Sequence, residues 1–134
     1  MVKMKSISNL ATLGRQEAEN ARLMHASVYA RARGIVPASE KVLEAELRER
    51  CKALGWMCIK LTGQYQRGLP DRLILMPDGH VCFVEIKTTG KKPTALQKVT
   101  HERLRALGYR VEVVDTNEIL DNLIVELLYE VQGA

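Results

Sequence analysis

The sequence predicts an α/β domain with a mixed β-sheet, and the order of its elements carries this prediction. After about residue 39, an amphipathic helical pattern is followed by three short apolar strands, a helix, a strand and a final helix. The second and third strands are joined by a short turn, whereas the third and fourth are separated by a helix long enough for a parallel crossover. The strands are apolar on both sides, so we expect helices on both faces of the sheet.

The first helix is expected over residues 39–54, with Ser39 as its N-cap and apolar residues at helical spacing. Glu40 and Glu44 fall on the side of this helix that faces the core, near its start. A buried carboxylate is costly unless it is paired or bound to a metal, whereas an exposed one simply complements the helix dipole. Both interpretations of Glu40 remain open at this point.

The remaining elements follow from alternation and from turn and cap residues. Strands are expected at residues 56–61, 72–76 and 81–86, with a turn at Pro77-Asp78-Gly79 between the last two. Thr94-x-x-Gln97 resembles a capping box and predicts a helix over 94–107. A strand at 109–114 is followed by a last helix that begins at Asp115-x-x-Glu118.

Residues 1–38 form a separate basic arm in this interpretation, and residues 39–134 form the domain. The net charge of +4 arises entirely in the arm, which has six Lys and Arg residues against two acids. A helix is expected over residues 8–33 and a linker over 34–38. Such an arm suits attraction to phosphates, although a solvated helical tail would explain the charge equally well.

Composition excludes several other classes of protein. The sequence has no apolar run long enough to span a membrane and no apolar segment typical of a secretory signal, so a cytosolic location is expected. The cysteines lack CxxC spacing and are expected to be buried free thiols. No histidine has a metal-ligand partner at helical or strand spacing, and we expect surface or capping roles for His25, His80 and His101.

Three ionisable residues are expected at one end of the sheet. Asp71 opens the second strand, and Glu85 and Lys87, two residues apart, share a face at the end of the third. Two carboxylates can hold one or two Mg²⁺ ions, which polarise a scissile phosphate, and a nearby amine can orient the attacking water. Asp71 shares their face only if the hairpin loop has three or five residues, or a bulge, because a two-residue turn would place it opposite Ile86.

Residues 68–115, extended back through residues 39–56, resemble the VRR-NUC family of the PD-(D/E)xK nuclease superfamily, and the match covers about residues 39–120. The shared pattern is an acid in the first helix, G-x-P-D, E-x-K and a Gln at the next helix. The resemblance implies a restriction-endonuclease-like core and an endonuclease that depends on Mg²⁺ or Mn²⁺, with no organic cofactor. It implies metal ligands at Asp71, Glu85 and the Ile86 carbonyl, and catalytic roles for Lys87 and Gln97. Glu40 would be a catalytic helix acid that helps to organise the metal site, with Glu44 as the competing candidate.

Stand-alone phage and bacterial members of this family resemble Holliday-junction resolvases. The resemblance therefore implies a homodimer that acts on branched DNA in DNA repair, in the cytoplasm of a bacterial or phage-infected cell. A nuclease acting on duplex DNA or RNA, and a DNA-binding module without chemistry, remain alternatives. Candidate DNA contacts are the polar residues that flank the expected site, namely Lys60, Gln64, Tyr65, Arg67, Lys91 and Lys92.

Overall fold

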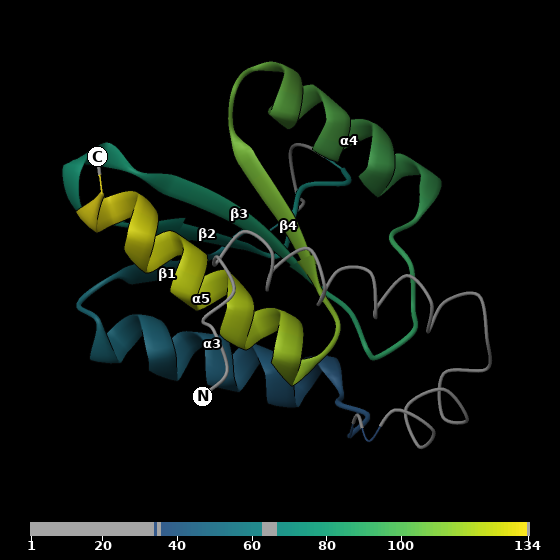
Figure 1. Ribbon diagram of the computed structural model, residues 1–134. Helices are drawn as coiled ribbons and strands as arrows, with labels where there is room; N and C mark the ends of the chain where they lie inside the picture. The colour runs from purple at the N-terminus through teal and green to yellow at the C-terminus, as the bar shows by residue number, and fades with distance from the viewer. Residues whose placement is uncertain (1–33, 35, 63–66, 134) are drawn as a thin grey trace.

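The computed structural model describes residue 34, residues 36–62 and residues 67–133 (Figure 1). The expectations for residues 1–33, including His25, and for Gln64 and Tyr65 therefore lie outside the described residues. The elements are, in order, α3 (Glu40–Ala53), β1 (Met57–Lys60), β2 (Arg72–Leu75), the 3-10 turn η1 (Pro77–Gly79), β3 (Val81–Ile86), α4 (Ala95–Ala106), β4 (Arg110–Val114) and α5 (Asn117–Gln132). Among them, no helix is long and apolar enough to cross a membrane.

The strands form one mixed sheet in the order β1-β2-β3-β4. The pairs β1–β2 and β2–β3 are antiparallel, and β4 runs parallel to β3 after the crossover through α4. This arrangement confirms the expected α/β fold with a mixed sheet. It also brings the carboxyl ends of β1 and β3 and the amino end of β2 to the same end of the sheet.

The main core lies between the sheet and the pair α3–α5, which cover one face, while α4 lies on the other (Figure 1). On the first face the strand side chains, such as Ile74 and Val84, are fully buried against Leu43 and Leu47 of α3. Their counterparts on the α4 face are only half-buried; these are Leu73, Leu75, Val81 and Phe83. Helices thus cover both faces, as expected, and the α4 face is less completely buried because a single helix covers it.

The β2–β3 hairpin has the odd-length loop that the proposed site requires. The Met76 N–H donates to the His80 carbonyl at 2.9 Å, which leaves Pro77, Asp78 and Gly79 in the loop. Asp78 and Gly79 adopt positive φ angles of 59° and 74°, a conformation tolerated by Asp and Gly. Arg72 pairs with Val84, so the same register places the preceding Asp71 opposite Glu85.

Several boundaries differ from expectation by one or two residues. The Ser39 cap and the Thr94–Gln97 capping box are both present. The N-cap of α5 is Thr116 rather than Asp115, because Asp115 is buried and its Oδ2 accepts a hydrogen bond from the Gly90 N–H at 3.1 Å. Ala38, expected in the linker, is also buried and its N–H donates to Thr89 Oγ1 at 2.9 Å.

Candidate active site

Asp71 is held at the end of the sheet by two backbone hydrogen bonds. Its carbonyl accepts from the Leu61 N–H at 2.8 Å, which extends the β1–β2 pairing by one step. Its Oδ2 accepts from the Ile86 N–H at 2.9 Å, across the β2–β3 pair. The Asp71 side chain therefore points along the edge of β3 toward the residues that end that strand.

Glu85 is the most deeply buried acid of the predicted set, with 1% of its surface exposed. Gln97 Nε2, from the start of α4, donates to Glu85 Oε1 at 3.0 Å. Lys87 Nζ lies 3.7 Å from the same oxygen. Glu85 Oε2 has no hydrogen-bond partner among the described residues. A buried carboxylate oxygen without a donor is costly, so this atom is well suited to accept a cation.

The charge of Glu85 acts on the carboxyl group of Asp71. The pKa of Asp71 is raised from its ordinary value of 3.8 to about 6. Burial is the largest cause, the hydrogen bond from the Ile86 N–H opposes it, and the charge and hydrogen bonding of Glu85 and the charge of Glu40 add smaller increases. Like charges forced together favour a protonated form. A divalent cation between the two groups would remove this cost. Such a pair of carboxyl groups is therefore a candidate metal site.

The two candidate helix acids occupy different environments. Glu40 is exposed in the first turn of α3, yet its charge contributes to the raised pKa of Asp71. Glu44 instead accepts from Arg72 Nε at 2.9 Å and from Arg72 Nη2. Arg72 already neutralises Glu44, whereas Glu40 is the helix acid whose charge acts on Asp71.

His101 belongs to this site, although we expected a surface or capping role for it from the sequence. That expectation is wrong, because only 2% of His101 is exposed and its Nε2 lies 3.8 Å from Glu85 Oε2. Among the described residues, neither of these two atoms has a hydrogen-bond partner. Gln97 and His101 are four residues apart on α4, so helical spacing could have indicated that both face the same carboxylate.

The loop that leads into Asp71 is docked on α4 through a close contact at Gly68. Gly68 has a φ of +84°, and a Cβ there would lie 2.6 Å from Thr100 Oγ1 and 2.8 Å from the Leu96 carbonyl oxygen. Thr100 Oγ1 also donates to the Arg67 carbonyl at 3.1 Å. The glycine of G-x-P-D thus fixes the distance between Asp71 and the helix that carries Gln97 and His101.

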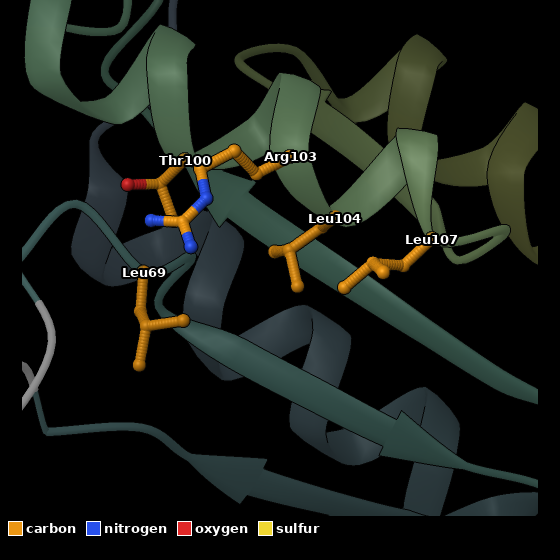
Figure 2. A pocket seen from close by; sticks show the side chains of 5 residues that line it. All are labelled: Leu69, Thr100, Arg103, Leu104 and Leu107. Atoms are coloured by element: carbon orange, nitrogen blue, oxygen red, sulfur yellow. The ribbon is translucent and has the colours of Figure 1, made fainter.

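A small, mostly apolar cavity of about 130 Å³ lies beside this contact (Figure 2). Arg103 reaches from α4 toward the loop that carries Leu69, and Leu104 and Leu107 point below the helix. The full lining is Leu69, Thr100, Arg103, Leu104 and Leu107. With no acid in its walls, the cavity adds no ligand or general base to the site.

The predicted DNA contacts that can be located are all exposed. Lys60 ends β1, Arg67 lies in the loop before Asp71, and Lys91 and Lys92 lie between β3 and α4. These segments all adjoin the end of the sheet that holds the two carboxylates. These four cations thus lie around the candidate site, whereas Lys87 lies within it.

The carboxylate oxygens at this site suit a hard cation that keeps part of its coordination shell for substrate and water. Among the residues that the structure describes, no three His, Cys, Asp or Glu side chains lie together as a metal cluster. Asp71 and Glu85 supply two carboxylates, and Glu85 retains a buried oxygen without a donor. Mg²⁺ is commonly held by one or two carboxylates together with substrate phosphates and water, so these residues fit that ion better than zinc.

Comparisons with known proteins identify the family of the chain. No protein-family model matches the chain. A curated relative, "Putative nuclease p44" of Acyrthosiphon pisum secondary endosymbiont phage 1, is 39% identical over 80 residues, which cover 60% of this chain and 86% of the relative. A solved structure described as a VRR_NUC domain superposes with a TM-score of 0.60 and 36% identity, covering 65% of this chain and 96% of that one. The chain therefore belongs to the VRR-NUC family of nucleases.

Proposed function

We propose that this nuclease is an endodeoxyribonuclease that depends on Mg²⁺ or Mn²⁺ and uses Asp71, Glu85 and Lys87 as its catalytic centre. The main support is the meeting of two carboxyl groups, one with its pKa raised to about 6, at a sheet end where an amine lies 3.7 Å from the second. A grouping of this kind is costly for stability and is typical of functional sites.

Asp71, Glu85 and the backbone carbonyl of Ile86 are the groups proposed to hold the ion. A divalent ion bound there supplies the Lewis acidity that polarises a scissile phosphate and activates water. Asp71 contributes fully only when it is ionised, which requires a pH above about 6. Gln97 fixes Glu85 through Oε1 and thereby leaves Oε2 available to the ion.

Lys87 is proposed to act on the substrate side of this centre. Its side chain is 14% exposed and its ammonium is positioned by Glu85. From there Nζ can donate a hydrogen bond to the attacking water or to a phosphate oxygen and offset the charge that develops on it. Glu40, at the first turn of α3, is proposed to orient water or the ion from the solvent side.

The proposed substrate is branched DNA, and the proposed assembly is a homodimer. A two-fold dimer matches the two-fold symmetry of a four-way junction and presents two centres to two strands. Lys60, Arg67, Lys91 and Lys92 surround the site and are proposed to contact phosphates. Cleavage of ordinary duplex DNA or of RNA is the competing proposal.

A substrate panel tests this function. Full-length protein is incubated with a labelled four-way junction, a flap, a linear duplex and RNA, each with Mg²⁺ or with EDTA. We expect cleavage only with Mg²⁺, fastest on the junction, and loss of cleavage in Lys87→Ala but not in the exposed control Lys98→Ala. Equal rates on junction and linear duplex would remove the branched-DNA proposal, and wild-type rates in Lys87→Ala would remove the catalytic assignment. Sedimentation velocity of the same protein tests the homodimer, which a monomer at micromolar concentration would contradict.

A further inference from the structure

A second cationic feature lies on the other face of the sheet from Asp71 and Glu85. A groove of about 270 Å³ runs between α3 and the edge strand β1. We call it the basic groove, and its lining residues are Lys41, Glu44, Ala45, Arg48, Lys60 and Arg72. Four of these six carry positive charge and one carries negative charge.

Within the described part of the chain, the charge of the basic groove is not balanced. Glu44 is bound to Arg72, which is only 7% exposed and also donates to the Cys58 carbonyl at 3.5 Å. Lys41, Arg48 and Lys60 are exposed, and none forms an ion pair with another described residue. The buried Arg72–Glu44 pair therefore forms the floor, and three unpaired cations form the rim.

Two arginines of the groove also act on a neighbouring thiol. The pKa of Cys58 is lowered to about 7, chiefly by a hydrogen bond with Cys51; the charges of Arg72 and Arg48 lower it as well, whereas burial and the charge of Glu44 raise it. Positive charge that favours a thiolate also favours a phosphate.

Two chain segments link the basic groove to the candidate active site. Lys41 directly follows Glu40, whose charge reaches Asp71. Arg72 directly follows Asp71 and pairs across the strands with Lys60. The groove and the candidate site therefore lie on opposite faces of the same end of the sheet.

We propose that the basic groove binds the DNA backbone beyond the cleaved bond, with Lys41, Arg48 and Lys60 as phosphate contacts. The nature of the ligand rests on the nuclease function proposed above. Lys41 and Arg48 lie on the same side of α3, seven residues and thus about 10 Å apart along the axis. This distance corresponds to about three nucleotides of one DNA strand. The groove thus guides the DNA strand, whereas cleavage takes place at the site that contains Asp71 and Glu85.

The test measures how DNA affinity depends on salt. Binding of a fluorescein-labelled four-way junction is followed by anisotropy in EDTA between 50 and 200 mM KCl, for wild type and for Lys41→Ala/Arg48→Ala. The control is Lys52→Ala/Lys98→Ala, which removes the same charge from exposed helical positions outside the groove. Each lost phosphate contact lowers the slope of log affinity against log salt by about 0.9, so over this range the affinity of wild type falls roughly 12-fold more than that of the groove variant.

Failure of this inference can be separated from failure of the proposed function. An unchanged affinity and slope in Lys41→Ala/Arg48→Ala, or an equal loss in the control, would overturn the role of the groove even if wild-type protein cleaves DNA. A reduced slope confined to the groove variant would support it even if no Mg²⁺-dependent cleavage were seen. Recovery of the slope in Lys41→Arg/Arg48→Lys shows that charge, rather than helix packing, is the cause.

Discussion

Asp71→Asn is expected to stabilise the metal-free protein while abolishing cleavage. The carboxyl group has a pKa of about 6 in the folded protein, against an ordinary value of 3.8. The folded state therefore holds this proton more tightly than the unfolded state does. Stability contributed by the protonated carboxyl is present below about pH 4 and is lost as pH rises through about 6. The difference corresponds to about 2–3 kcal/mol after allowance for partial exposure.

An asparagine keeps an oxygen that can accept from the Ile86 N–H and removes the charge that opposes Glu85. In EDTA at pH 8, urea unfolding of Asp71→Asn should therefore give a free energy of unfolding about 2–3 kcal/mol above that of wild type. At pH 4 the two proteins should be nearly equal. Asp78→Asn, an exposed acid in the hairpin loop, is the control and should change stability by less than about 0.5 kcal/mol at either pH.

The pH dependence is the decisive part of this comparison. An Asp71→Asn variant that is less stable than wild type at pH 8, or whose stability relative to wild type is the same at pH 4 and pH 8, would refute the reasoning. In that case neither burial nor the charge of Glu85 would disfavour ionised Asp71 in the folded protein, and the argument for a cation at this site would lose its electrostatic basis.

Three further outcomes are expected. At subsaturating Mg²⁺, the single-turnover cleavage rate should rise as pH increases through about 6, because protons compete with the ion for Asp71. A rate independent of pH between 5 and 7 under these conditions would contradict this. Gly68→Ala should lower the free energy of unfolding by about 1–3 kcal/mol more than Gly55→Ala. Both glycines have positive φ, but of the two only Gly68 has neighbours within 4 Å of an added Cβ. Equal losses in chemical denaturation would show that the close contact is unimportant. His101→Ala should lower the free energy of unfolding by about 2–3 kcal/mol and slow cleavage, because it leaves a cavity beside a buried carboxylate. In the same assays His80→Ala, at a half-buried position, should have neither effect.

Local patterns predicted most of the fold. The bounds of β3 follow from an apolar run between a Pro-Asp-Gly turn and a Lys-Thr-Thr-Gly segment, and the start of α4 follows from its capping box. Alternation within the strands could not decide whether Asp71 and Glu85 share a face. That depends on whether the hairpin loop has two or three residues, and a change of one residue reverses the face.

Packing between distant segments accounts for what the sequence pattern left undecided. Glu40 and Glu44 lie near each other on the helical wheel, and only the buried Arg72, from a different element, separates their roles. The burial of His101 depends on the angle at which α4 docks on the sheet, which in turn depends on the contact at Gly68. Such contacts between elements are not encoded in the periodicity of any single segment.

The central claim is that Asp71 and Glu85 share one divalent cation, and calorimetric titration of metal-free protein with MnCl₂ at pH 8 tests it most directly. Wild type should bind with a measurable heat, and Glu85→Gln, which keeps an acceptor for Gln97 but loses the charge, should bind at least about tenfold more weakly. Asp71→Asn should show the same loss. Binding isotherms for both variants that superimpose on that of wild type would contradict the claim.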